Sequence, residues 1–287
     1  MSYRIEKLQT AAGHSIVSRV FPAQLNDQQL ANGVCIIAPA TGVAQYLYDD
    51  FAYWLTARGY NVVTFDYDGV GLSVDRHAQY SKSDILSWAS NDCPAVLAFV
   101  EQEFPTQERT WIGHSVGGQV LGMMASTDKI DRAITVASGT GTWWYNSMPT
   151  KRFIWFLWYI LVPVTVPIFG YFPGEKVKLM CNMPKGVMLQ LRHWCLNKEY
   201  AIGSEGQWLR DRFANVKTPI TAIAFSDDDM MSMKNVDLLH RYFVGAPMTR
   251  ITVTPKDINQ KRIGHIGWHR KCYQEMWDKV FTPVLGA

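Results

Sequence analysis

The sequence lacks several features that mark common classes of protein. Its 28 Lys and Arg residues exceed its 25 Asp and Glu residues by only three, so it has no basic excess of the kind found in nucleic-acid-binding domains. Its five cysteines are an odd number without a C-x-x-C pair, which argues against a disulfide framework and a cysteine zinc site. Residues 1–15 contain no apolar run, so no signal peptide is predicted. Together these absences favour a cytoplasmic protein with free thiols and no nucleic acid as partner.

Charge is also missing from one long segment. Residues 153–172 carry no charged side chain, and Lys151 and Arg152 stand directly before them. A helix of this length could span a bilayer. Pro163 and Pro167 are expected to break it, because proline lacks a backbone N–H and clashes with the preceding turn. The sequence therefore predicts a buried or membrane-touching lid here rather than a membrane span.

What is present is a large apolar fraction (48%) arranged as alternating strand and helix patterns. The expected strands cover residues 15–21, 33–38, 61–66, 110–113, 130–137, 219–225 and 248–254, and the expected helices 48–58, 84–104, 116–124, 235–243 and one after 268. Such alternation is typical of a mostly parallel sheet flanked by helices, with right-handed crossovers. The predicted fold class is therefore α/β.

This alternation stops between residues 139 and 205, where the sequence becomes aromatic and broken by proline. We expect a helical cap at 139–205, inserted into one α/β core made of 1–138 and 206–287. The segment carries seven Lys or Arg residues against three Glu, a net charge of +4 that leaves −1 for the core. Five of the eleven tryptophans also lie in it. An aromatic cap predicts an apolar substrate pocket, and its candidate lining residues are Trp143, Trp144, Trp155 and Trp158.

The motif Gly113-His114-Ser115-Val116-Gly117 stands where an expected strand gives way to an expected helix. In that setting G-x-S-x-G forms a sharp turn that lifts the serine hydroxyl above the sheet, and its glycines allow a strained backbone with close neighbours. The pattern by itself is common, so its meaning depends on this setting and on partners downstream. Ser115 is the predicted nucleophile.

A serine nucleophile needs a base to take its proton and an acid to orient that base. In this arrangement the order along the chain is serine, acid, histidine. Three consecutive aspartates follow the expected strand 219–225. We favour Asp228 as the acid, with Asp229 as the alternative and Asp227 as the least favoured of the three.

The predicted base is His265, in a glycine-flanked loop after the last expected strand. His269 competes for this role, since it lies only four residues further on. The pair lacks the glutamate of a H-E-x-x-H zinc motif, so no metal is expected. His114, beside the serine, is interpreted as a packing or orienting residue and His193, in the cap, as structural.

Acyl transfer also needs two backbone N–H donors for the developing oxyanion. Val116, directly after the nucleophile, is one expected donor. The second should come from residues 39–43, after the expected strand 33–38. The usual His-Gly is absent there, and Thr41 is the favoured candidate.

The sequence GHSVGG, the acidic turn and IGHIGW together resemble the α/β-hydrolase superfamily. Residues 66–73, DYDGVGLS, resemble the D-x-R-G-x-G-x-S loop of its esterase, lipase and peptidase-like members, with Asp68 where arginine is usual. The segments APATGVAQYLYDDFA, GYFPGEK, MPKGV and IGHIGWHR narrow the resemblance to a bacterial group of predicted α/β hydrolases, often labelled serine-aminopeptidase-like. The resemblance covers nearly the whole chain. It implies the α/β-hydrolase fold and the triad, and no particular substrate.

These features predict a serine hydrolase that cleaves a small-molecule carboxylic ester through an acyl-enzyme on Ser115. We expect no metal or organic cofactor. A thioesterase and an aminopeptidase-like hydrolase are the alternatives among enzymes. A non-catalytic protein that binds an apolar ligand or a membrane is the alternative outside them, and transient lipid contact through the cap is left open. The acyl and alcohol groups and the oligomeric state are not predicted.

Overall fold

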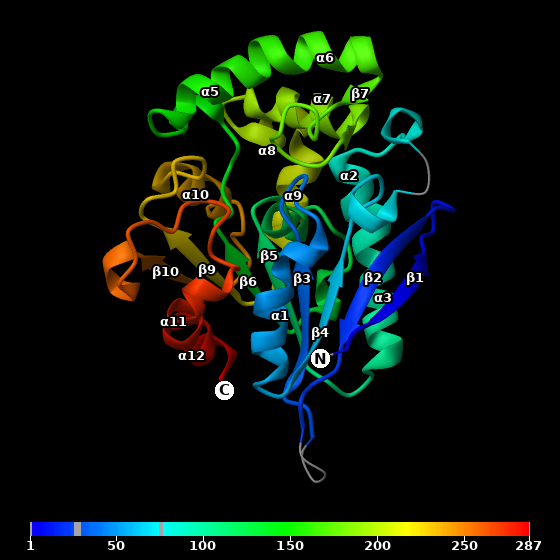
Figure 1. The fold of residues 1–287 in the computed structure, drawn as a ribbon, viewed down its shortest axis with the longest axis vertical. Helices are drawn as coiled ribbons and strands as arrows, with labels where there is room; N and C mark the ends of the chain where they lie inside the picture. The colour runs from blue at the N-terminus through cyan, green and yellow to red at the C-terminus, as the bar shows by residue number, and fades with distance from the viewer. Residues whose placement is uncertain (1, 26–29, 75–76, 287) are drawn as a thin grey trace.

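The computed structural model describes residues 2–25, 30–74 and 77–286, and these form an eight-stranded sheet (Figure 1). The strand order is β1-β2-β4-β3-β5-β6-β9-β10. β1 and β2 are antiparallel to each other, and β2 is antiparallel to β4; the remaining pairs are parallel. The strands are β1 (Arg4–Gln9), β2 (Ser15–Phe21), β3 (Gly33–Ala38), β4 (Tyr60–Phe65), β5 (Arg109–His114), β6 (Arg132–Val136), β9 (Ile220–Phe225) and β10 (Met248–Val253). The predicted α/β fold class is confirmed.

The central strands are buried on both faces. All six residues of β3 are buried. Val34 and Ile36 belong to one hydrophobic cluster, whereas Cys35 and Ile37 belong to a second cluster on the opposite face. This explains why β3 reads as a continuous apolar run rather than an alternating one. β1, by contrast, is an edge strand in which only Leu8 is buried, and the sequence analysis did not predict it.

Helices cover both faces of this sheet (Figure 1). The predicted helix 84–104 is present as two α-helices joined by a π-helical turn, Trp88–Asp92. In chain order the α-helices outside the segment between β6 and β9 are α1 (Asp49–Thr56), α2 (Ile85–Ser87), α3 (Cys93–Glu103), α4 (Val116–Gln119), α10 (Met233–His240), α11 (Gln274–Met276) and α12 (Thr282–Leu285). α1 and the C-terminal helices pack on the face that buries Cys35, and α3 packs on the other.

Residues 139–205, between β6 and β9, lie beyond the carboxyl ends of the strands, at the top of Figure 1. We call residues 139–205 the cap. One hydrophobic cluster contains cap residues such as Val187 together with sheet residues such as Ile36, so the cap packs directly on the core. The division at residues 139 and 205 stays a prediction. The elements of the cap are α5 (Thr150–Phe156), α6 (Val162–Phe169), β7 (Tyr171–Phe172), β8 (Met183–Pro184), α7 (Lys185–Cys195) and α8 (Tyr200–Glu205). α9 (Gln207–Asn215) follows the cap and precedes β9.

The prediction that Pro163 and Pro167 break the apolar segment is wrong. α5, the π-helical turn Leu157–Leu161 and α6 form one continuous helix, Thr150–Phe169, which we call the cap helix. Pro163 falls in the first turn of α6, directly after the π-helical turn, where the backbone tolerates a missing N–H. Among the described residues, this is the one helix long and apolar enough to cross a membrane. It lies along the top of the protein, with its inner side packed on the rest of the molecule.

Candidate active site

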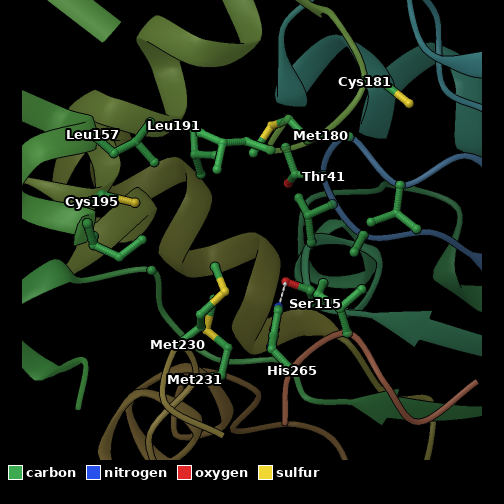
Figure 2. Close-up of a pocket in the computed structure, with 18 of the residues that line it drawn as sticks. Thr41, Ser115, Leu157, Met180, Cys181, Leu191, Cys195, Met230, Met231 and His265 are labelled. Atoms are coloured by element: carbon green, nitrogen blue, oxygen red, sulfur yellow. Dashed lines mark hydrogen bonds between the residues drawn. The ribbon is translucent and has the colours of Figure 1, made fainter. Parts of the chain in front are cut away.

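Ser115 occupies the turn between β5 and α4, as the motif predicts. Its backbone has φ 52° and ψ −114°, a region that side-chain-bearing residues rarely adopt. The turn is so tight that a Cβ atom on Gly117 would lie 2.2 Å from the carbonyl oxygen of Ala38. Glycine at this position therefore lets α4 approach β3. The hydroxyl of Ser115 is left at the wall of a cavity beneath the cap (Figure 2).

The structure brings the three predicted triad residues together. Nε2 of His265 lies 3.1 Å from Oγ of Ser115, and Nδ1 of His265 lies 2.8 Å from Oδ2 of Asp228. Asp228 follows β9 and His265 follows β10, so both come from the carboxyl ends of neighbouring strands. All three residues are buried. This is the geometry in which an imidazole can take the serine proton while a carboxylate fixes its tautomer.

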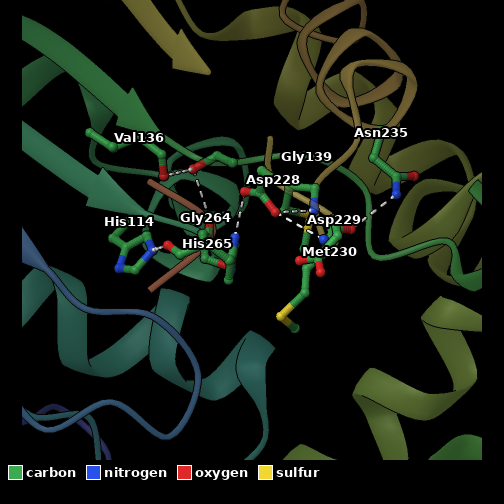
Figure 3. Close-up of polar contacts among 12 residues, drawn as sticks. His114, Val136, Gly139, Asp228, Asp229, Met230, Asn235, Gly264 and His265 are labelled. Atoms are coloured by element: carbon green, nitrogen blue, oxygen red, sulfur yellow. Dashed lines mark hydrogen bonds and ion pairs between the residues drawn. The ribbon is translucent and has the colours of Figure 1, made fainter. Parts of the chain in front are cut away.

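The three consecutive aspartates have three different contacts. Besides His265, Asp228 accepts the backbone N–H groups of Met230 and Met231 through Oδ1, at 2.9 and 2.8 Å (Figure 3). These bonds hold its carboxylate and leave Oδ2 for the imidazole. Neither neighbouring aspartate contacts His265 through its side chain.

Asp227 and Asp229 instead hold the surrounding segments. Asp227 accepts the backbone N–H of Ile263 at 2.8 Å, just before His265. Asp229 accepts the hydroxyl of Thr150 at 2.6 Å and the guanidinium of Arg262 at 3.2 Å. Asp227 therefore fixes the histidine loop, and Asp229 fastens the first residue of the cap helix to the acidic turn.

His114 orients the site and does not reach the serine. Its Nε2 lies 3.0 Å from the carbonyl oxygen of His265, which can only accept, so Nε2 carries the proton. Nδ1 therefore accepts the hydroxyl of Tyr48, at 2.7 Å, while that hydroxyl accepts the backbone N–H of Ala40, at 3.0 Å. Burial lowers the pKa of His114 well below its usual value, with the nearby imidazoles of His265 and His269 acting in the same direction. The neutral imidazole thus links the loop after β3 to the histidine loop.

His269, the competing candidate for the base, lies elsewhere. Its ring packs against Tyr48, with 4.8 Å between centroids, and burial lowers its pKa to about 4. His193 is exposed on α7. Across the described ranges, no group of three or more His, Cys, Asp or Glu side chains is placed to hold a metal ion.

Both expected oxyanion donors lie in the wall of the cavity beside Ser115. Val116 is the first residue of α4, where a helix leaves its N–H groups without intrahelical acceptors. Thr41 lies in the turn after β3, and Figure 2 shows it across from Ser115. Within the described part of the chain, neither backbone N–H donates to a protein group. Both N–H groups are available for the role that the sequence analysis gave them.

The cavity has a volume of about 570 Å³ and a mainly apolar wall. Most of its side chains come from the loop after β3, the cap helix, the segment between β7 and β8, α7 and the turn after Asp228. Most of them are not recognisable from the sequence, among which are Leu157, Met180, Leu191, Cys195, Met230 and Met231 (Figure 2). One signal was available, because two methionines directly follow the acidic triplet.

Of the four tryptophans expected in the pocket, only Trp158 lies in its wall; the prediction is wrong for the other three. The ring of Trp155 points outward from the cap helix, is 45% exposed and stacks on Tyr159. Trp143 and Trp144 pack edge to face against each other just before that helix. Residues four apart share one row along a helix. Trp158 belongs to the buried row with Ile154, whereas Trp155 belongs to the adjacent exposed row with Tyr159.

Asp68, which stands where arginine is usual, faces no cation among the described residues. Its carboxylate accepts the hydroxyl of Ser83, and its backbone N–H donates to Asp92 at 2.8 Å. Asp92 is paired instead with His14, at 2.7 Å. This part of the loop is therefore held by different contacts from those that an arginine would make.

Comparison with known proteins identifies the family and the fold of the chain. The family described as serine aminopeptidase, S33, matches residues 29–185, more than half of the chain. Solved structures with the same fold include the esterase domain of a Rhodothermus marinus protein, with 12% identity, a TM-score of 0.59, and coverage of 99% of this chain and 97% of that one. A Pyrococcus furiosus esterase has 13% identity and a TM-score of 0.63, covering 99% and 91%.

An acylaminoacyl peptidase aligns with all of this chain and 41% of its own, at 13% identity and a TM-score of 0.61. At these identities the structures show the fold alone. A comparison with curated proteins found no significant match. The family match and the fold together confirm the resemblance found in the sequence: the chain belongs to the serine aminopeptidase S33 family and is a hydrolase of the α/β-hydrolase superfamily.

Proposed function

We propose that the protein is a serine hydrolase that cleaves carboxylic esters with an apolar acyl or alcohol part. The observation that carries this proposal is that Oγ of Ser115, 3.1 Å from Nε2 of His265, opens into an apolar cavity of about 570 Å³. A hydroxyl with a base in hydrogen-bonding contact can be activated as a nucleophile, and the cavity can accept a hydrocarbon group.

The reaction follows from these positions. Oγ of Ser115 attacks the ester carbonyl carbon while its proton passes to Nε2 of His265. The N–H groups of Val116 and Thr41 stabilise the tetrahedral oxyanion. The carbon–oxygen bond to the alcohol then breaks, and His265 returns the proton to the leaving oxygen. Water attacks the acyl-enzyme with His265 again as base, which releases the acid and regenerates Ser115.

The cavity wall supports an uncharged substrate over a free amine. Among the described residues of the wall, Glu175 is the one carboxylate and there is no Lys or Arg. Glu175 is exposed and already accepts the side-chain amide of Asn182, at 2.9 Å. An aminopeptidase must bind a substrate ammonium, and a charge of this kind needs a well-placed counter-charge. Thioesters remain compatible with the same cavity, because their acyl transfer uses the same groups.

Labelling with a fluorophosphonate probe tests the enzymatic role. Wild type should be labelled covalently and Ser115→Ala should not, while Ser138→Ala, another buried serine near the turn, should still be labelled. Folded wild-type protein that resists the probe would support the non-catalytic alternative, a binder of apolar ligands.

Comparison of substrates tests the ester assignment. p-Nitrophenyl acetate, butyrate, octanoate and dodecanoate should be compared with aminoacyl-anilides and acyl-thioesters at matched concentrations. We expect kcat/KM to rise from acetate to octanoate, since each buried methylene contributes about 0.8 kcal/mol. Faster turnover of the anilides would replace the ester proposal with an aminopeptidase, and faster turnover of thioesters with a thioesterase.

A further inference from the structure

The outer side of the cap helix is apolar and exposed, although the helix belongs to a folded domain. Only 28% of its most apolar 18-residue window is buried. The exposed apolar side chains are Phe153, Trp155, Phe156, Tyr159, Ile160, Val164, Ile168 and Phe169. Contiguous apolar surface of this kind on a soluble fold marks a binding surface. We call these eight side chains the outer face.

The inner side of the same helix accounts for its attachment to the protein. Five side chains on this side are buried, at positions i, i+3, i+4, i+8 and i+12: Ile154, Leu157, Trp158, Val162 and Val166. Helices that pack on a core normally carry polar residues on the opposite side. This helix carries apolar residues there instead. Packing within the chain therefore explains one side of the helix and leaves the other without a partner in the described structure.

Positive charge stands at both ends of the outer face. Lys151 and Arg152 precede it. Lys176 places its Nζ 4.7 Å from the ring centroid of Phe169, at the far end of the helix. Glu175 lies beside Lys176 and Lys178 follows, so this end also has a net positive charge. A hydrophobic face bounded by basic residues matches the acyl region and anionic headgroups of a lipid surface.

From this arrangement we propose that the outer face docks on the surface of an anionic lipid bilayer, with the cap helix lying parallel to the membrane plane. Trp155 and Tyr159 stack at 5.7 Å between centroids and are 45% and 42% exposed. Trp and Tyr are enriched where acyl chains meet headgroups, because their rings are apolar and their N–H or O–H groups are polar.

A second copy of the chain fits this surface less well. A symmetric contact between two cap helices would bring the basic ends of both copies close together, and like charges would oppose it. A membrane span is also disfavoured, since the buried side chains on the inner side would have to leave the cap. A lipid surface satisfies the apolar and the basic parts without displacing either.

Docking would also bring the cavity close to the lipid. Phe153 belongs to the outer face and lines the cavity that holds Ser115. Ile154, Leu157 and Trp158, on the inner side of the same helix, line that cavity too. The proposed ester hydrolysis would then act on substrates that partition into membranes. The docking itself depends only on the surface and holds whether or not the protein is an enzyme.

Vesicle flotation tests the proposal, with Ser115→Ala as the background so that binding is measured without turnover. The protein should float with vesicles of equal parts phosphatidylcholine and phosphatidylglycerol, and less with phosphatidylcholine alone. Ile160→Gln/Val164→Gln/Ile168→Gln should weaken the partition coefficient at least about tenfold on both vesicles. The control, Ile5→Gln/Leu30→Gln/Val244→Gln, changes three exposed apolar residues outside the cap and should bind as the background does.

A charge variant provides an independent measurement. In Arg152→Glu/Lys176→Glu the partition coefficient should fall about tenfold or more on the anionic vesicles and stay unchanged on phosphatidylcholine alone. The reason is that each basic residue near an anionic surface contributes about 1 kcal/mol to binding. Failure to float with anionic vesicles at low salt would overturn the proposal, as would unchanged binding of the glutamine variant. A dimer in sedimentation velocity that this variant converts to monomer would assign the outer face to a second copy instead.

Discussion

The phenol oxygen of Tyr48 and Nδ1 of His114 are 2.7 Å apart, at the centre of a buried chain of hydrogen bonds. One end of the chain is the backbone N–H of Ala40, next to the expected oxyanion donor Thr41. The other end is the carbonyl oxygen of His265. Two loops that must keep fixed positions relative to Ser115 are thus joined by two side chains. The histidine of the G-H-S-V-G motif therefore supports the site from behind the nucleophile.

Removing the Tyr48 hydroxyl should weaken both loops. In Tyr48→Phe, the N–H of Ala40 and Nδ1 of His114 lose their partner while buried, which should cost about 1–3 kcal/mol of unfolding free energy. We also expect kcat to fall by about tenfold, with a smaller change in KM, because the oxyanion loop is less well held. Urea unfolding and ester kinetics measure the two effects. Tyr53→Phe is the control, since its hydroxyl bonds to no described residue; equal effects in both variants would contradict this role.

Substitution of each of the three consecutive aspartates should have a different effect on kcat and on stability. Asp228→Asn should lower kcat by about 10⁴-fold, because an amide in this place favours the wrong imidazole tautomer. Asp229→Asn should stay within a few-fold of wild type in kcat, since its contacts are with Thr150 and Arg262. Asp227→Asn should mainly reduce stability, by loosening the backbone before His265. Steady-state kinetics and thermal unfolding of the three variants test this order. A larger loss of kcat in Asp229→Asn would make Asp229 the acid.

The buried His269 should make stability depend on pH. Burial lowers its pKa to about 4 in the folded state, against about 6.5 when unfolded. The neutral ring therefore contributes its full stability above about pH 6.5, and this contribution is lost as the pH falls to about 4. This difference between the folded and unfolded pKa values corresponds to a change of about 3 kcal/mol at most in unfolding free energy. The unfolding free energy, measured in urea at several pH values in this range, should change less steeply with pH in His269→Gln than in wild type. In His193→Gln, which changes an exposed histidine, it should change with pH as in wild type. Identical slopes in all three proteins would contradict the burial argument.

Filling the cavity should shorten the accepted acyl chain. Leu191, on α7, lines the cavity, and Leu189 on the same helix is exposed outside it. Leu191→Trp should reduce kcat/KM for the dodecanoate ester by more than about tenfold, because a few methylenes of the acyl chain can no longer be buried. The kcat/KM for the acetate ester should change little. Leu189→Trp is the matched control and should leave both values near wild type. If Leu191→Trp lowers kcat/KM equally for both esters, the acyl group does not bind in the part of the cavity next to Leu191.

Patterns among neighbouring residues are enough to establish the local features of the protein. The buried strands are recognisable because a strand covered on both faces must be apolar throughout, as in the six residues 33–38. The nucleophile turn is recognisable because only glycine tolerates its close approaches, as at Gly117. The position of His265 after the last strand follows from chain order in this fold. Each of these depends on residues adjacent in sequence.

Other features depend on contacts between residues far apart in the chain, and these are visible only in the folded protein. Three consecutive aspartates have the same local sequence signal, and only the segments around them, with Ile263, His265 and Thr150, give each a separate role. Pro163 and Pro167 predict a break, yet a π-helical turn and packing on the cap allow one helix to continue. The direction of each ring on that helix then places Trp158 in the cavity and Trp155 on the surface. Local pattern fixes the elements, whereas the direction of each side chain depends on which remote group it contacts.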